Sequence, residues 1–125
     1  MTVFRGTRRV IIHNDSHSIG RQSSDLAHEL SHGLLLHPPT PAMNDCGCRD
    51  WNQDLEDEAE WLSGALLISE EAALHIARRG LSCEEAASAY RVSERMVQWR
   101  LNVTGARQRV ERAARRRNSS GFNVR

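Results

Sequence analysis

The five residues from His28 to His32 form a metal-binding pattern, His-Glu-x-x-His. On an α-helix, side chains four positions apart lie on the same face, so both imidazoles can reach one ion. The residue after the first His projects beside that ion, where the Glu29 carboxylate can take a proton from water. The spacing therefore predicts a Zn²⁺ site with His28 and His32 as ligands and Glu29 as general base. The alternative is two polar His side chains on an amphipathic helix.

The surrounding segment has the pattern of a helix over residues 23–36. Candidate N-cap residues lie at its start: Ser23, Ser24 and Asp25. Leucines recur every four residues and predict its buried face: Leu26, Leu30 and Leu34. The Pro38-Pro39 pair is expected to end it. His28 and His32 fall off the leucine stripe, which favours a metal site over burial in a core.

A catalytic zinc site needs a third protein ligand and keeps one position open for water. Residues 54–68 also have a helical pattern, with Glu56 as the expected third ligand. The apolar residues of this helix share one face: Leu55, Ala59, Leu62 and Leu66. Glu60, one turn after Glu56, is expected to accept a hydrogen bond from a ligand imidazole. Glu58 is turned about 200° from Glu56 and is expected to be solvated. The alternative is a charged surface without metal.

From Val10 to about Leu101 the chain resembles the ImmA/IrrE-type zinc metallopeptidases. Residues 10–15, Val-Ile-Ile-His-Asn-Asp, look like the strand of that family that precedes the zinc helix. Arg21-Gln22 and the run Leu-Ala-His-Glu-Leu-Ser-His over residues 26–32 look like its R-Q…A-H-E-L-G-H segment. Residues 56–62, Glu-x-x-Ala-Glu-x-Leu, look like its E-x-x-A-N-x-F helix, followed by Leu66-Leu67. Three positions depart from the pattern: Ser31 for a common Gly, Glu60 for a common Asn and Ser69 for a frequent Pro.

The resemblance implies a gluzincin-like site with His28, His32 and Glu56 as ligands and Glu29 as base. It also implies cleavage of a protein substrate inside the cell, a repressor-type transcription regulator, which would relieve repression. In such a reaction the ion polarises a water molecule, and Glu29 moves its proton to the leaving nitrogen.

A second donor to the developing oxyanion is expected. His17, Arg21 and Tyr90 are candidates, and His17 is favoured because it lies in the loop just ahead of the zinc helix. The strand near Ile11-Ile12 is expected to pair with an extended substrate backbone.

The predicted fold is α+β and mostly helical, a small zincin-like domain with a short N-terminal sheet. The metallopeptidase core would cover residues 1–70, a helical extension residues 71–105, and a basic, partly disordered tail residues 106–125. Residues 10–12 form the expected strand, and the fragment before them could add a second. In the tail, residues 107–117 could extend a helix.

Cap signals predict three helices in the extension. Ser69 would cap residues 70–79, Ser82 would open a capping box with Glu85 for a helix to about Tyr90, and Ser93 would cap residues 94–102. The last two helices have helix-turn-helix spacing. The positions that such a motif buries are Val92, Ser93, Met96, Val97 and Leu101. DNA binding would place three polar residues near a groove, namely Arg95, Gln98 and Arg100. The alternative is that this geometry is plain packing.

Two other classes of function stay open: a helix-turn-helix DNA-binding regulator and a repressor-binding adaptor, each with a structural or vestigial zinc site. The intact Glu29 favours the enzyme, because metal binding does not need that base. Nucleic acid could bind through the Arg-rich tail, although a solvated end is favoured.

Composition bounds the remaining possibilities. The net charge is +1, so no overall attraction to nucleic acid is predicted. Every basic residue is Arg, which is interpreted as an effect of genomic composition. With 39% apolar residues the core is expected to be small, and a bound metal could contribute to folding. No signal peptide or membrane span is evident, which predicts a cytoplasmic protein with reduced thiols. Cys46 and Cys48, with His37 and Cys83, could form another zinc site, but two thiols in a polar loop are favoured.

Overall fold

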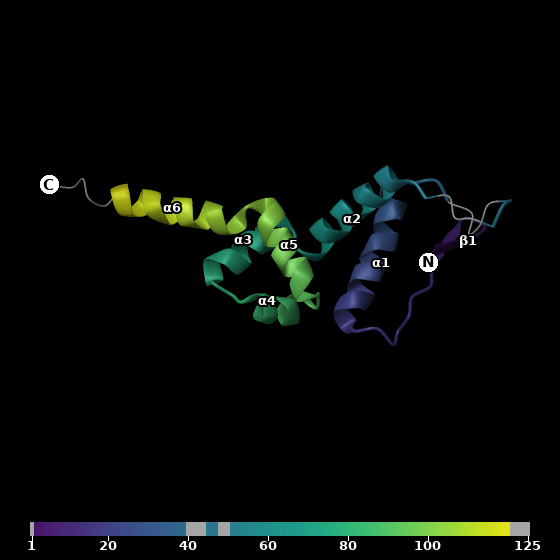
Figure 1. The fold of residues 1–125 in the computed structure, drawn as a ribbon, viewed down its shortest axis with the longest axis horizontal. Coiled ribbons are helices and arrows are strands. Elements are labelled where there is room, and N and C mark those ends of the chain that lie inside the picture. The colour runs from purple at the N-terminus through teal and green to yellow at the C-terminus, as the bar shows by residue number, and fades with distance from the viewer. Residues whose placement is uncertain (1, 40–44, 48–50, 121–125) are drawn as a thin grey trace. The chain divides into compact units, whose positions relative to one another are not determined.

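The computed structural model describes residues 2–39, 45–47 and 51–120, and it divides into two compact units at Leu66–Leu67 (Figure 1). The first unit holds two strands and two helices: β1 (Thr2–Arg5), β2 (Arg8–Ile11), α1 (Ile19–Leu34) and α2 (Gln53–Leu67). The second holds four helices: α3 (Glu70–Arg79), α4 (Cys83–Tyr90), α5 (Glu94–Thr104) and α6 (Ala106–Ser120). The described residues are thus mostly helical with a short N-terminal sheet, as predicted.

The two strands form an antiparallel hairpin, with Thr2 opposite Ile11 and Arg5 opposite Arg8. The fragment ahead of Val10 therefore does supply a second strand. Gly6 lies in the connecting turn with φ 62°, a conformation that glycine adopts without steric cost. Arg9 ties the hairpin to α1, because its guanidinium occupies the space that a side chain at Gly33 would need.

Helix α1 begins earlier than predicted. Its N-cap is Ser18, whose hydroxyl accepts a hydrogen bond from the Arg21 amide at 3.4 Å, and not one of the residues 23–25. The Gln22 side chain reinforces this start by donating to the backbone carbonyl of His17 at 2.8 Å. The helix ends at Leu34, two residues before the predicted end.

The predicted buried face of α1 was wrong. Ala27 and Ser31 are its buried residues, whereas Leu30 and Leu34 are 51% and 63% exposed. In helix α2 the predicted apolar stripe is confirmed in part, because Ala59 is fully buried while Leu66 is 50% exposed. The buried residues of the two helices are all small: Ala27 and Ser31 in α1, and Ala59, Ser63 and Gly64 in α2.

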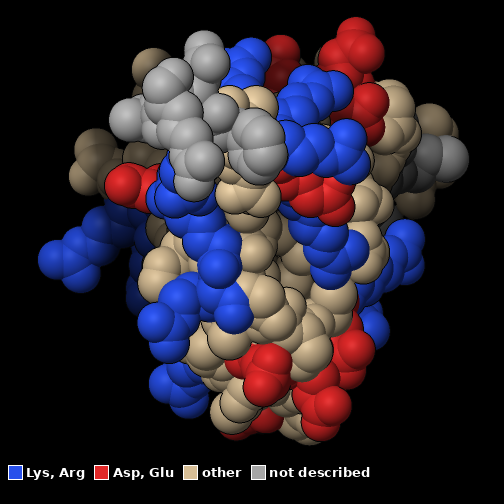
Figure 2. Space-filling view, turned by 90° about the vertical axis from the view of Figure 1, so that its left-hand side faces the viewer, with Lys and Arg blue, Asp and Glu red and all other residues tan. Residues whose placement is uncertain are grey.

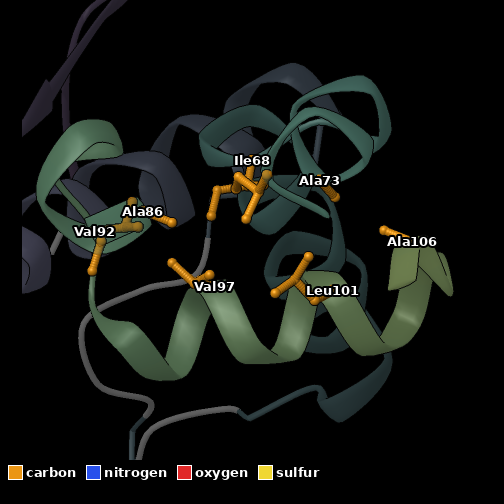
Figure 3. Packing of buried hydrophobic residues seen from close by; sticks show 9 residues of the cluster. Ile68, Ala73, Ala86, Val92, Val97, Leu101 and Ala106 are labelled. Carbon is orange, nitrogen blue, oxygen red and sulfur yellow. The ribbon is translucent and has the colours of Figure 1, made fainter. Parts of the chain in front are cut away.

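The second unit has a continuous apolar core (Figure 3). Nine buried hydrophobic residues form it: Ile68, Ala73, Ile76, Ala86, Ala87, Val92, Val97, Leu101 and Ala106. Its helices begin as the sequence indicated, with Ser69, Ser82 and Ser93 accepting hydrogen bonds from backbone amides of their first turns. Gly80 and Gly105 end α3 and α5 in left-handed conformations.

Helices α4 and α5 are joined by a short turn in which Arg91 is left-handed and Val92 is buried. Val97 and Leu101 are buried as predicted, but Ser93, also predicted to be buried, is exposed. Arg100 is only 4% exposed. Its Nε donates to the Ile68 carbonyl at 2.8 Å, and burial lowers its pKa against the opposing charge of Glu70. Arg100 is therefore not exposed as the DNA-binding alternative would require, because its side chain is buried and bonded to the Ile68 carbonyl.

Helix α6 extends three residues beyond the predicted residues 107–117 at its C-terminal end, and residues 121–125 of the predicted tail lie outside the described residues. Its Arg side chains are exposed along the whole helix. Among the described residues, no helix combines the length and the apolar character needed to cross a membrane.

Candidate metal centre

The two His side chains of α1 and one carboxylate of α2 converge. The Nε2 atoms of His28 and His32 are 3.1 Å apart. Glu56 Oε2 lies 3.0 Å from Nε2 of His28, and Glu56 Oε1 lies 3.5 Å from Nε2 of His32. Within the described part of the chain, these three form the group of His, Cys, Asp or Glu side chains that could hold a metal ion.

The donor set fits zinc. Tetrahedral ligands at bond lengths of about 2.0–2.1 Å lie about 3.3–3.4 Å from one another. The separations here run from 3.0 to 3.5 Å when both Glu56 oxygens are counted, and one donor atom from each residue gives a group within 4.8 Å. Two imidazoles and a carboxylate are the ligands of many catalytic zinc sites. The side chains of His28, His32 and Glu56 are 31%, 18% and 26% exposed, so water can reach the group.

Glu29 lies beside this group on α1. Burial opposes its ionisation, but the pKa of Glu29 still lies below the ordinary value, and the largest of the effects that lower it is a hydrogen bond from the Thr2 hydroxyl. The carboxylate is therefore an ionised acceptor at neutral pH. Glu29 and His28 line a cavity of about 300 Å³ together with Asp25 and residues 11–14, the segment where β2 ends.

Burial also lowers the pKa of His32, and the charges of His28 and His37 act in the same direction against the opposing effect of Glu56. The neutral ring is thereby favoured, and a neutral imidazole is the form that binds a metal.

Of the residues considered as oxyanion donors, His17 contacts the lining of the cavity. Its Nδ1 is 3.4 Å from Asp25 Oδ2, and its Nε2 is 3.3 Å from the Asn14 amide nitrogen. Asn14 and Asp25 both line the cavity, so His17 contacts two of the lining residues, and its role in the reaction stays a prediction. Arg21 is exposed on the first turn of α1, and Tyr90 packs against the core of the second unit.

Sequence reasoning missed a further contact of His32. Its Nδ1 lies 2.8 Å from Nδ1 of His37, whose Nε2 lies 3.0 Å from Oε2 of Glu58. Glu58 is exposed, as expected, but its carboxylate also pairs with the nearly buried ring of His37. Glu60 is exposed, and among the described residues no hydrogen bond joins its carboxylate to the imidazole of His28 or His32.

The contact between His37 and His32 was not predicted because it depends on the backbone conformation just before His37. Leu36 has φ 56°, the His37 amide donates to the His32 carbonyl at 3.0 Å, and the Leu36 amide donates to the Gly33 carbonyl at 3.2 Å. This is a Schellman C-cap, which normally places Gly where Leu36 stands. A glycine there would have been a signal that the chain turns back toward the helix.

The remaining candidate zinc ligands do not join a described cluster. Cys46 is exposed, and Cys48 lies outside the described residues. Cys83 belongs to α4, where its Sγ lies 3.5 Å from Oε1 of Gln98.

Comparison with known proteins agrees with this geometry. Neither a curated protein nor a solved structure gave a significant match to the chain. The sequence profile of the M78 peptidase family, described as the IrrE N-terminal-like domain, matches residues 1–102. That range includes His28, Glu29, His32 and Glu56, and the family consists of zinc-dependent metallopeptidases. The chain therefore belongs to the M78 peptidase family.

Proposed function

We propose that this chain is a zinc-dependent metalloendopeptidase. The observation that carries the proposal is the convergence of His28 Nε2, His32 Nε2 and the Glu56 carboxylate, all within 4.8 Å of one another. Glu29 adds the base that a purely structural metal site would not need.

In the proposed reaction, His28 and His32 hold the ion through Nε2, and Glu56 holds it through its carboxylate. A bound zinc ion supplies Lewis-acid polarisation of a water molecule and of the scissile carbonyl. Glu29 accepts the proton of that water at its carboxylate and donates it to the leaving nitrogen. The Thr2 hydroxyl, which donates to Glu29 Oε2, supports the ionised form that this first proton transfer requires.

The proposed substrate is a repressor-type transcription regulator, as the family resemblance implies. The cavity beside Glu29 is lined by residues 11–14, where the hairpin strand ends. An extended substrate segment that passes this lining would present its backbone to His28 and Glu29.

The test is cleavage of a candidate repressor, encoded beside this gene, by the full chain with and without zinc. Glu29→Gln is the matched variant, because it keeps the size of the side chain and removes the base. We expect Glu29→Gln to retain zinc and to lower the cleavage rate by about 10²–10⁴-fold. Cleavage at the wild-type rate by Glu29→Gln would contradict the mechanism. Binding without cleavage by both proteins would instead favour the adaptor function.

A second candidate function is binding of nucleic acid by the second unit. Residues 67–125 hold twelve of the seventeen basic residues but only six of the sixteen acidic ones. Figure 2 shows many Arg side chains spread over one face of the molecule, with Asp and Glu side chains among them and along the lower edge. Binding of this kind rests on phosphate contacts, so its affinity should fall steeply with salt. Absence of binding to a short DNA duplex at low salt would dismiss this candidate.

A further inference from the structure

His37 and Glu58 extend the candidate metal centre beyond its three converging ligands. The His37 side chain is 6% exposed, so both of its ring nitrogens need partners inside the protein. Its Nε2 lies 3.0 Å from Glu58 Oε2, and its Nδ1 lies 2.8 Å from His32 Nδ1. Three side chains thus form a continuous hydrogen-bonded series from α2 to His32.

When His37 is neutral, the chemistry of the three groups determines which atom donates and which accepts in each hydrogen bond of the series. The Glu58 carboxylate can only accept, so Nε2 of His37 carries the hydrogen. Nδ1 of His37 then has a lone pair and accepts from Nδ1 of His32. The hydrogen of His32 is therefore on Nδ1, and its Nε2 lone pair faces His28 and Glu56.

We infer that His37 and Glu58 are positioning residues, which hold the His32 ring in the tautomer and orientation that a metal ion requires. The inference rests on the proposed zinc site and adds a part that the family pattern did not supply. A metal-bound His commonly donates its other N–H to a carboxylate or carbonyl. Here a second imidazole stands between His32 and the carboxylate.

The backbone conformation of Leu36 supports a positioning role for His37. A left-handed conformation costs a non-glycine residue about 1–2 kcal/mol, and Leu36 gains little burial in return because it is 87% exposed. The Schellman hydrogen bonds at this residue are what bring the His37 ring back to His32.

The test measures zinc affinity of the full chain by competition with a chromophoric chelator. His37→Phe keeps an aromatic ring but removes the acceptor, and Glu58→Ala removes the carboxylate from a largely exposed position. Glu60→Ala is the matched control, because it removes the same charge from the same helix. We expect zinc affinity to fall about 10–100-fold in the first two variants and to change little in the control. The double variant His37→Phe/Glu58→Ala should be no weaker than His37→Phe alone, because the two residues act in series.

A second readout separates positioning from general loss of structure. Long-range ¹H–¹⁵N NMR spectra report which ring nitrogen of His32 carries hydrogen. We expect the Nδ1–H tautomer in the wild-type protein and a mixture in Glu58→Ala. The inference is overturned if the wild-type chain binds zinc and His37→Phe binds it equally well, if Glu60→Ala weakens zinc more than Glu58→Ala, or if His32 carries its hydrogen on Nε2. A wild-type chain that binds no zinc would overturn the proposed function as well.

Discussion

Each of the two units is stabilised internally by a different kind of interaction. The second unit buries nine hydrophobic residues in one cluster. In the first unit the buried hydrophobic residues among those described are Ala27 and Ala59, and three buried residues are polar: Ser31, His37 and Ser63. Burial of apolar area is the main stabilising term in folding. Because the first unit buries less apolar area, hydrophobic burial stabilises it far less than the second unit. Its helices α1 and α2 meet instead through the imidazole and carboxylate groups of the site.

This difference predicts that metal binding and folding are coupled in the first unit alone. Metal ligands that converge only in the folded state add their binding free energy to stability. Removal of zinc by a chelator should lower amide hydrogen-exchange protection in α1 and α2 by orders of magnitude and should leave α3, α4 and α5 unchanged. The His28→Ala/His32→Ala variant should behave like the chelated protein. Uniform loss of protection over both units would show that they unfold together, and it would contradict a coupling of metal binding to the first unit alone.

The complementary change affects the second unit. Leu101→Ala removes a side chain that is 2% exposed in the apolar cluster, and such truncations cost about 2–5 kcal/mol. We expect the denaturation midpoint of the second unit to fall while zinc affinity stays at the wild-type value. Val103→Ala, at a 39% exposed position of the same helix, is the control and should cost much less. A parallel loss of zinc affinity in Leu101→Ala would mean that the site depends on the apolar core.

The smallest expected effect concerns Leu36. Leu36→Gly should stabilise the first unit by up to about 1 kcal/mol, because glycine adopts the left-handed conformation without steric cost. The Schellman turn and the contact of His37 with His32 should persist, so zinc affinity should not decrease. Thermal unfolding of the zinc-loaded protein, followed at probes in each unit, checks this. Destabilisation by Leu36→Gly would show that the leucine side chain has a packing role that its exposure does not indicate.

The sequence predicted the second unit more accurately than the first. Helices α3, α4 and α5 start at serines whose side chains accept local hydrogen bonds, namely Ser69, Ser82 and Ser93. Two of them end at glycines, Gly80 and Gly105. These boundaries can therefore be predicted from neighbouring residues alone. The apolar positions Val97 and Leu101 were also predicted correctly. There, local propensity and tertiary packing agree.

In the first unit the leucine stripe of α1 predicted the wrong buried face. The pattern of Leu26, Leu30 and Leu34 assumes that hydrophobic burial orients a helix, whereas Ala27 and Ser31 are the buried residues here. The His-Glu-x-x-His spacing still located the converging side chains, because that geometry is internal to one helix. The contact between His37 and Glu58 depends on a left-handed leucine, for which the sequence gives no local signal.

The uneven distribution of charge between the units has a consequence for colloidal behaviour. Residues 1–66 carry ten acidic and five basic residues, and residues 67–125 carry six acidic and twelve basic ones. The whole chain has a net charge of only +1 and an isoelectric point near 7.9, so two molecules at neutral pH repel each other weakly. At low ionic strength the acidic first unit of one molecule attracts the basic second unit of another. The protein should therefore self-associate in dilute buffer and become more soluble as salt is added, which light scattering would detect as a smaller particle size.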